Sequence, residues 1–366
     1  MDEEYRIVAA EALREFCQTV FEKSGVPPED ARASADVLVR ADRRGIESHG
    51  VARLRRYYTG LKNGLMIARP EIKILHETPV SARIDGGNAL GQVAGRRGME
   101  TAISKARKNG IGLVAVGNSN HFGIAGYYSM MALEYDLIGL SLTNSNAYVV
   151  PTFGREGMIG TNPLSVAVPA LTERPFVLDM STAVATLGKL EVHHRMGKKI
   201  PRGWAIDEKG QSCDDPDRIL RNLKSKAGGG ILPLGGDGEE WGGHKGYGLD
   251  LLADILSGVL SGSGYLNLLY PQTPEGKSLP SRIGHFFGAW RVDFFRPAEE
   301  FKRDMDDFIR RLKNSAKAEG QARIYVHGEK EFELEEKFEK NGLPLYSKVY
   351  EDLAAIGREV GADFNL

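Results

Sequence analysis

Residues 112–123 read Gly-Leu-Val-Ala-Val-Gly-Asn-Ser-Asn-His-Phe-Gly. The first half, residues 112–117, is a short apolar run between glycines, and this pattern predicts a strand buried on both faces. The second half is polar, and its asparagines, serine and histidine would lie where the strand ends. Because α/β sheets place their sites at the carboxyl ends of strands, we expect a sheet protein with a polar site at this edge.

The rest of the chain alternates between strand-like and helix-like patterns, which predicts a mixed α/β fold. Further strands are expected at residues 72–75, 80–84, 138–143, 164–168, 176–179 and 323–326. Helices are expected at residues 29–44, 49–62, 92–108, 124–135, 182–194, 247–259, 299–313, 330–340 and 347–360. The glycine-rich run from residue 201 to about residue 243 reads as loop. We therefore expect a sheet lobe over residues 76–245 and a helical lobe built from residues 1–75 together with residues 246–366.

Composition narrows the classes of function. Lys and Arg number 48 against 49 Asp and Glu, so no basic excess points to nucleic acid or to a membrane surface. Cys17 and Cys213 form no CxxC pattern, which suggests a reducing compartment without a disulfide framework. The acidic start at Asp2 is unlike a basic signal peptide, and no apolar run approaches the length of a membrane span. A cytoplasmic protein is expected. No metal site is expected, because His193 and His194 are adjacent and no HExxH motif occurs.

The stretch Glu47-Ser48-His49-Gly50-Val51-Ala52-Arg53 holds the first candidate site residues. Ser48 is predicted to cap the helix that follows. His49 and Arg53 are four residues apart, which would put both side chains on one helix face. An imidazole transfers protons near neutral pH and a guanidinium binds a carboxylate through two hydrogen bonds, so the pair could receive a small organic acid. A capping serine, a surface histidine and a solvated arginine would also explain the stretch.

Two later stretches could bind a nucleotide or an acid. In the loop after the opening strand, Asn120 and His121 suggest polar recognition and proton transfer. Asparagines in left-handed backbone and a structural histidine would also explain that loop. In the run Gly-Gly-His-Lys-Gly-Tyr-Gly of residues 242–248, Lys245 and Gly246 stand at a predicted helix start, where free amides form an anion site suited to phosphate. A flexible hinge is the alternative, and the spacing differs from that of the GxxxxGK[ST] phosphate loop.

Asp179 ends a predicted strand, in the run Leu-Asp-Met-Ser-Thr of residues 178–182. An acid at a strand end can hold ribose hydroxyls, although capping of the next helix is the commoner role for an aspartate. A dinucleotide fingerprint is missing, because the nearest match, Gly110-Ile111-Gly112 with Ala115, precedes a strand instead of following one. The residues themselves therefore predict no Rossmann fold.

Six motifs occur in an order that resembles a known family. They are Ser48-His49-Gly50 with Arg53, Asn120-His121-Phe122-Gly123, Gly160-Thr161-Asn162-Pro163, Asp179-Met180-Ser181, Gly203-Trp204-Ala205 and Gly243-His244-Lys245-Gly246-Tyr247-Gly248-Leu249. The set resembles the malate/L-lactate dehydrogenase family that lacks a Rossmann fold, whose relatives include ureidoglycolate and sulfolactate dehydrogenases. The resemblance covers nearly the entire chain, and six ordered motifs are far more specific than any one of them.

The resemblance implies an NAD- or NADP-dependent oxidoreductase that interconverts a 2-hydroxy acid and its 2-oxo acid, such as malate and oxaloacetate or lactate and pyruvate. It also implies a cofactor-binding sheet lobe beside a helical lobe, and a homodimer with sites near the subunit interface. A sulfolactate or ureidoglycolate type of dehydrogenase is the alternative within the family. A non-catalytic protein that binds a nucleotide or an organic acid with the same loops is the alternative in another class.

The same resemblance implies roles for individual residues. His49 is the expected proton donor, with Ser48 beside it, and Arg53 is the expected clamp for the substrate carboxylate. His121 is a second active-site histidine that could bind the substrate or act as the acid/base, so the assignment between the two histidines stays open. The expected cofactor contacts are Asn120, Thr161, Asp179, Met180, Ser181, Lys245, Gly246, Gly328 and Glu329.

The chain departs from the family pattern at two places. The imine-reducing branch carries an aspartate at the position of Lys189, which argues against an imine substrate. The usual Pro-Gly-Glu near the C-terminus is His327-Gly328-Glu329 in this chain, which leaves the cofactor contacts of this segment less certain.

Overall fold

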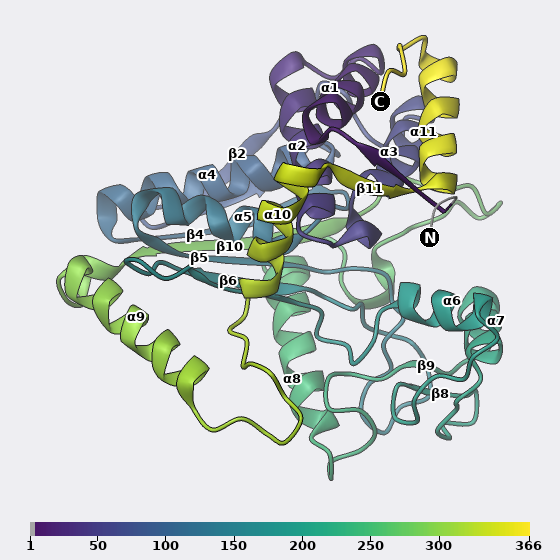
Figure 1. Cartoon of the computed structure of the whole chain (residues 1–366). Coiled ribbons are helices and arrows are strands. Elements are labelled where there is room, and N and C mark those ends of the chain that lie inside the picture. The colour runs from purple at the N-terminus through teal and green to yellow at the C-terminus, as the bar shows by residue number, and fades with distance from the viewer. Residues whose placement is uncertain (1–3) are drawn as a thin grey trace.

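A seven-stranded mixed sheet forms the centre of the protein, and Figure 1 shows it edge-on between layers of helices. The computed structural model describes residues 4–366. The strands run in the order β2-β3-β4-β10-β5-β6-β7. Their bounds are β2 Lys73–Glu77, β3 Ser81–Asp85, β4 Ile111–Ser119, β5 Leu137–Thr143, β6 Leu164–Val168, β7 Phe176–Met180 and β10 Ile283–Arg291. Within the described residues, β3 and β4 are the one parallel pair of this sheet. The mixed α/β class predicted from the sequence is confirmed.

Strand β10 is the main element that the sequence prediction missed. It pairs antiparallel with β4 on one side and with β5 on the other, although residues 246–366 were assigned to the helical lobe. Its first seven residues are all buried, so the alternation that marks a half-exposed strand is absent. Gly284 lets β10 pass close to the π-helical segment Ile255–Val259 that packs on the sheet, since a Cβ there would lie 1.9 Å from the carbonyl oxygen of Ser257. The proposed lobe boundaries must therefore leave this strand to the sheet.

Helices cover both faces of the sheet. One face carries α4 (Gly91–Asn109) and α5 (Ala125–Met131), and the other carries α8 (Gly243–Asp254), which continues as a π-helix over Ile255–Val259. Neighbouring residues of β10 point to opposite layers: Phe287 belongs to the core on the α4 side and Phe286 to the core on the α8 side. Burial of a phenylalanine side chain stabilises a fold by up to about 3 kcal/mol, so this strand anchors both layers.

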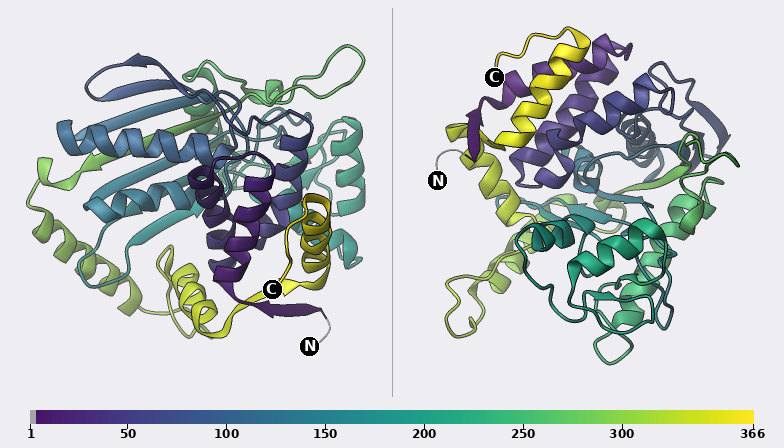
Figure 2. Two further views of the ribbon diagram at one scale, coloured as in Figure 1. Left: turned by 90° about the horizontal axis from the view of Figure 1, so that it is seen from above. Right: turned by 90° about the vertical axis from the view of Figure 1, so that its right-hand side faces the viewer.

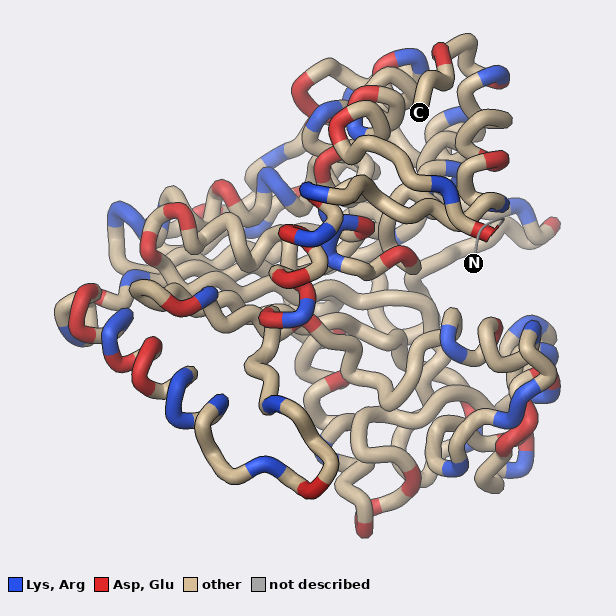
Figure 3. The backbone as a smooth tube through the Cα atoms, in the orientation of Figure 1, with Lys and Arg blue, Asp and Glu red and all other residues tan. Residues whose placement is uncertain are grey.

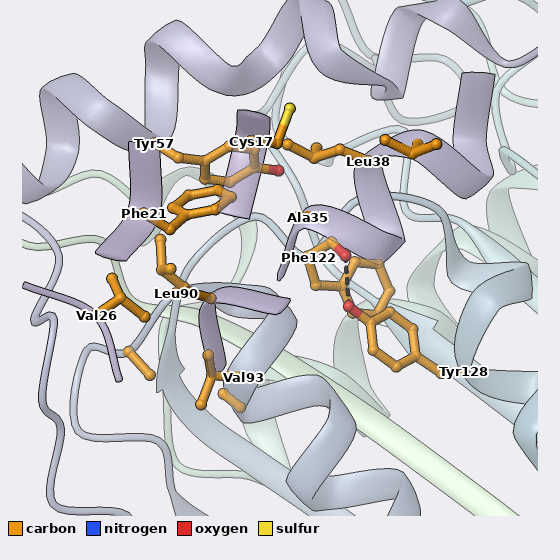
Figure 4. Packing of buried hydrophobic residues seen from close by; sticks show 14 of the residues in the cluster. Cys17, Phe21, Val26, Ala35, Leu38, Tyr57, Leu90, Val93, Phe122 and Tyr128 are labelled. Atoms are coloured by element: carbon orange, nitrogen blue, oxygen red, sulfur yellow. Dashed lines mark hydrogen bonds between the residues drawn. The ribbon is translucent and has the colours of Figure 1, made fainter. Parts of the chain in front are cut away.

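The two ends of the chain meet in a helical layer, as Figures 1 and 2 show. Helices α1 (Ala10–Lys23), α2 (Pro28–Arg43) and α3 (Leu54–Lys62) pack together, and α11 (Ser347–Val360) packs against α1 and α3. Short strands β1 (Tyr5–Val8) and β11 (Leu343–Tyr346), which the sequence did not predict, pair antiparallel beside them. Figure 4 shows the shared core, where Phe21, Leu38 and Tyr57 lie against one another.

The segment after β7 forms a small lobe with its own core. It holds α6 (Leu187–Arg195), α7 (Pro216–Ser225) and the two-residue strands β8 (Ala205–Ile206) and β9 (Gly230–Ile231). The prediction of a loop over residues 201–243 is therefore wrong in part. Helix α7 has a start signal that the sequence prediction did not use. The Asp215 carboxylate accepts hydrogen bonds from the amides of Asp217 and Arg218, and a proline follows Asp215 at the first helical position.

Two helices complete the chain before α11. Helix α9 (Ala298–Asn314) is held at the β6–β7 turn by the buried Asp306, whose carboxylate accepts from the amides of residues 171–173. Helix α10 (Glu329–Asn341) lies next to α2. The strand predicted at residues 323–326 is not formed, and this segment has no regular structure. Charged residues are frequent along α9 and along the α6–α7 segment, whereas the sheet strands carry few of them (Figure 3). Among the described residues, no helix is both long enough and apolar enough to cross a membrane.

Candidate functional site

The stretch around His49 forms two short 3₁₀ turns instead of the start of one helix. The turns cover Glu47–His49 and Val51–Arg53, and α3 begins only at Leu54. The predicted capping role of Ser48 is therefore wrong, because its Oγ lies 2.9 Å from Nδ1 of His49 and bonds no helix amide. The Arg53 Nε donates to the carbonyl oxygen of Ser48 at 2.6 Å, which leaves its two terminal nitrogens free for another partner.

Asp42 at the end of α2 explains why the chain folds in this way. Its Oδ2 accepts a hydrogen bond from the amide of Val51 at 2.8 Å. The carboxyl group lies so close to Gly50 that a Cβ there would sit 1.9 Å from Oδ1. Burial raises the pKa of Asp42 to about 8, so the carboxyl is mostly protonated near neutral pH. The buried Asp42 thus fixes the kink at Gly50 that sets the direction of His49.

His49 and His121 lie face to face, although 71 residues separate them in the chain. Their ring centroids are 5.3 Å apart and the planes differ by 21°. Burial lowers the pKa of His49 to about 4, with the charges of Arg53 and Arg56 acting in the same direction. Burial and Arg56 also hold the pKa of His121 well below its usual range. Both imidazoles are therefore neutral near pH 7.

The tautomer of His121 follows from its neighbours. The Tyr57 Oη lies 2.6 Å from Nδ1 of His121, and the amide of Gly123 donates to the same nitrogen at 3.4 Å. Burial raises the pKa of Tyr57 to about 12, so its hydroxyl keeps its proton and can donate. An Nδ1 that accepts from two donors leaves the proton of the neutral ring on Nε2.

The adjacent Phe122 is fixed in the core, where its carbonyl accepts from Tyr128 (Figure 4).

A cavity of about 210 Å³ lies in front of the two histidines. Several of the residues expected from the sequence line it, and they come from distant parts of the chain. These are Ser48, His49, His121, Thr161, Asp179, Met180 and Ser181. Most of its exposed wall is apolar, and the polar groups are few and converge from several strand ends, which is the usual make-up of a small-molecule site.

Asp179 lies at the end of β7 and serves a helix other than the one predicted. Its Oδ2 accepts from the amide of Gly126 in the first turn of α5 at 2.7 Å, whereas the next helix along the chain begins only at Leu187. Burial raises the pKa of Asp179 to about 6, while the Gly126 amide and Arg44 act in the opposite direction. The position of this carboxyl beside a cavity and a helix start suits hydroxyl recognition.

A second cavity of about 290 Å³ adjoins the first, since Ile46 and Asp179 line both. Gly328 lies in its wall, as do Arg44 and His327 from neighbouring segments. The expected contact Glu329 faces elsewhere: its carboxylate is paired with Lys313 at 2.7 Å and with Arg323 at 3.0 Å.

Other expected residues lie outside both cavities. Asn120 is 3% exposed, donates to the carbonyl oxygen of Ala89 at 2.8 Å and accepts from Ser281 at 2.6 Å, which makes it part of the loop framework. The amides of Lys245 and Gly246 both donate to the carbonyl oxygen of Gly242, so these two amides of the predicted anion site already have a partner within the chain. Arg53 is exposed beside the histidines but does not line the cavity.

Arg56, Tyr57 and Tyr270 are the site residues that the sequence reading missed. The Arg56 Nη2 donates to the Tyr270 hydroxyl at 3.0 Å, and Tyr270 lines the first cavity. Arg56 follows Arg53 by three residues, a helical spacing that could have revealed it. No local pattern marks Tyr270, because it belongs to an irregular segment that the fold brings to the site.

Comparison with known proteins identifies the family of the chain. A profile described as malate/L-lactate dehydrogenase matches residues 8–354. A malate dehydrogenase of Pyrococcus abyssi is 48% identical over 361 residues, which cover 99% of this chain and 97% of the relative. An L-sulfolactate dehydrogenase of Methanocaldococcus jannaschii is 39% identical over 97% of both chains. The solved malate dehydrogenase of Pyrococcus horikoshii OT3 superposes with a TM-score of 0.89 at 44% identity, over 100% of this chain and 98% of that one. The chain belongs to the malate/L-lactate dehydrogenase family of NAD(P)-dependent hydroxyacid dehydrogenases.

Proposed function

We propose that the protein interconverts a 2-hydroxy acid and its 2-oxo acid, with malate and oxaloacetate or lactate and pyruvate as the substrate pairs to be tested first. The observation that carries the proposal is the stacked pair His49 and His121, both neutral near pH 7, beside a cavity with Arg53 at its side. A neutral imidazole can take the hydroxyl proton during oxidation, and the same ring can return it during reduction.

His49 is the proposed acid/base, and His121 is the proposed hydrogen-bond donor. If the Nδ1 proton of His49 is donated to Ser48, its Nε2 is free to accept the proton of the substrate hydroxyl. His121 has its proton on Nε2 and can hold the substrate oxygen through that group. Such positioned proton transfer contributes typically about 10²–10⁴-fold to a rate.

Arg53 is the proposed clamp for the carboxylate next to the reacting carbon. Its Nε is used by Ser48, and among the described residues no carboxylate lies within ion-pair distance of it. A carboxylate bound to the free terminal nitrogens would fix which face of the substrate is presented, which is the orientation contribution to catalysis.

We propose that the two adjoining cavities, which share Ile46 and Asp179, together receive a nicotinamide cofactor. Asp179 joins them and offers a carboxyl suited to ribose hydroxyls, and Thr161, Met180 and Ser181 line the first cavity beside it. Gly328 lines the second. A nicotinamide cofactor, when bound, supplies or accepts the hydride. Either NAD or NADP is compatible with this proposal. We do not include Asn120, Lys245, Gly246 and Glu329 in the proposed site, because they lie outside both cavities.

We also propose a homodimer in a reducing, cytoplasmic setting. Leu249, Leu252, Ile255 and Val259 follow one face of α8 and its π-helical extension, and each is between 41% and 54% exposed. A contiguous apolar stripe of this kind is typical of a subunit interface. Cys17 and Cys213 are free and buried. Light scattering should give twice the chain mass, and a monomer at micromolar concentration would refute the dimer.

A steady-state screen tests the proposed reaction. Oxaloacetate, pyruvate, 3-sulfopyruvate and the oxidation product of ureidoglycolate are each offered with NADH and with NADPH, and the loss of absorbance of the reduced cofactor is followed. Turnover of at least one 2-oxo acid is expected. Cofactor binding without turnover of any of them would refute the proposed function.

A further inference from the structure

Arg56 lies in an electrostatic setting that its neighbour Arg55 does not share. Both arginines belong to α3. The guanidinium of Arg55 is paired with Asp352 at 2.6 Å and also with Glu359 on α11. Arg56 is half-buried, and no ion pair to it is found in residues 4–366; its one side-chain hydrogen bond there is to the hydroxyl of Tyr270. A half-buried cation without a counter-ion is costly, so this position favours an anion from outside the chain.

The position of Arg56 points to the substrate as the source of that anion. Arg53 and Arg56 are three residues apart at the start of α3, and both charges act on the two imidazoles of the site. Arg55, one residue earlier, points toward α11 instead. Tyr270 connects Arg56 to the wall of the first cavity.

We propose that Arg56, held in place by Tyr270, binds a second anionic group of the substrate and thereby selects 2-oxo and 2-hydroxy acids with two negative charges. Arg53 holds the carboxylate next to the reacting carbon, and Arg56 holds a distal carboxylate or sulfonate. This inference rests on the proposed function and assigns the specificity of the same site to one residue.

Charge balance supports a dianion over a monoanion. Arg53 and Arg56 have no carboxylate partner among residues 4–366, and their charges act on two neutral histidines, so a monoanionic acid such as pyruvate would leave one guanidinium without a partner. A planar guanidinium binds a carboxylate through paired hydrogen bonds, which gives both affinity and orientation. The same charge opposes formation of an imidazolium at His49, and a distal anion bound to Arg56 would relieve that opposition during proton transfer.

The test compares Arg56→Gln with the matched control Arg55→Gln, and adds Tyr270→Phe. For each protein, kcat/KM is measured with oxaloacetate, 3-sulfopyruvate and pyruvate under the same cofactor. In Arg56→Gln the preference for the two dianions over pyruvate is expected to fall roughly 30- to 100-fold, as for loss of a charge-assisted hydrogen bond. Tyr270→Phe should lower the same ratio by a factor of about 3–10, because it loosens Arg56 without removing its charge. Arg55→Gln should leave the ratio unchanged.

The pH profile supplies a second readout that a merely structural role would not move. Removal of the positive charge at Arg56 should raise the pKa of the acidic limb of kcat/KM for oxidation of the hydroxy acid, whereas Arg55→Gln should not.

An unchanged substrate ratio in Arg56→Gln, with turnover retained, would overturn the inference and leave the proposed function intact. A wild-type protein that turns over no 2-oxo acid would instead overturn the proposed function. A drop in oxaloacetate but not in sulfopyruvate would identify the distal anion as a carboxylate.

Discussion

The Tyr57 hydroxyl lies 2.6 Å from Nδ1 of His121, and this contact joins the helical layer to the sheet edge at the centre of the site. The Tyr57 side chain is fully buried, and burial keeps its hydroxyl protonated, so it holds His121 as a fixed donor through Nε2.

Tyr57→Phe should reduce kcat/KM roughly ten-fold, the size expected for the loss of one buried hydrogen bond to a working group. The dissociation constant of the reduced cofactor, measured by fluorescence titration, should stay within about two-fold because the phenyl ring still fills its site. Tyr58→Phe is the matched control, since Tyr58 is the adjacent buried tyrosine and makes no hydrogen bond or ring contact with His121 in residues 4–366. Equal losses in the two variants would contradict the anchoring role of Tyr57.

The two histidines should differ when each is replaced by asparagine. His49→Asn should lower kcat by about 10²–10⁴-fold, because it removes the acid/base. His121→Asn should cost less, roughly 10- to 100-fold, because asparagine keeps a donor although it loses the geometry. Stopped-flow measurement of a single turnover checks both, with the exposed His194→Asn as control. A larger loss in His121→Asn than in His49→Asn would reverse the proposed assignment.

Gly50→Ala should damage the site more than the fold. The added Cβ would collide with the Asp42 carboxyl, so the kink between the two 3₁₀ turns must shift and His49 must move with it. We expect kcat to fall by roughly 100-fold or more, since small misplacements of a catalytic group are expensive. Asp42→Asn should retain most activity, because the amide oxygen can still accept from the Val51 amide. Asp42→Ala should lose it, and thermal unfolding of all three variants separates misplacement from misfolding.

The acidic limbs of kcat/KM and of kcat should lie at different pH values, because the pKa of His49 should change when substrate binds. In the free enzyme His49 has a pKa of about 4, and oxidation needs the neutral ring, so kcat/KM for the hydroxy acid should fall only as the pH drops toward about 4. A bound anionic substrate offsets the charges of Arg53 and Arg56, so the pKa in the complex rises and the acidic limb of kcat should appear at higher pH. Coincident limbs in the two profiles would show that these arginines do not face the substrate.

Asp250 should make stability depend on pH. Its carboxyl group is buried, and burial raises its pKa to about 8 from an ordinary 3.8, although Thr182 and Asn162 act in the opposite direction. Between these values the folded state binds more protons than the unfolded state, so the free energy of unfolding should decrease as the pH rises from 4 to about 8. Asp250→Asn should reduce this slope in urea titrations at several pH values, and the buried Asp42, whose pKa is also raised to about 8, should account for the part that remains. A wild-type slope that the variant keeps would assign it to another group.

The local pattern of apolar and polar residues was sufficient to predict the helices that keep one exposed face. The predicted helices at residues 92–108 and 347–360 differ from α4 and α11 by no more than one residue at either end. Strand β10 was not predicted, because its first seven residues are all buried and such a run has no periodicity that distinguishes a central strand from other buried segments. Strands β8 and β9 have two residues each, which is too short for any periodicity.

The site could be predicted in its residue types but not in its geometry. Family resemblance brought His49, His121, Thr161 and Asp179 together, and all four line one cavity. The predicted helix start at Ser48 and the helical spacing of His49 and Arg53 were both misleading, because the buried Asp42 imposes a kink that lies outside the local pattern. The contact with Tyr270 depends on tertiary packing of an irregular segment, and no rule of spacing relates residue 270 to residue 56.

The place of β10 between β4 and β5 has a consequence for how the chain acquires its structure. During synthesis, β4 and β5 are complete long before residue 283 is made, yet the strand that separates them is missing. The two halves of the sheet therefore remain unjoined until most of the polypeptide has left the ribosome, and contacts between such distant segments form slowly.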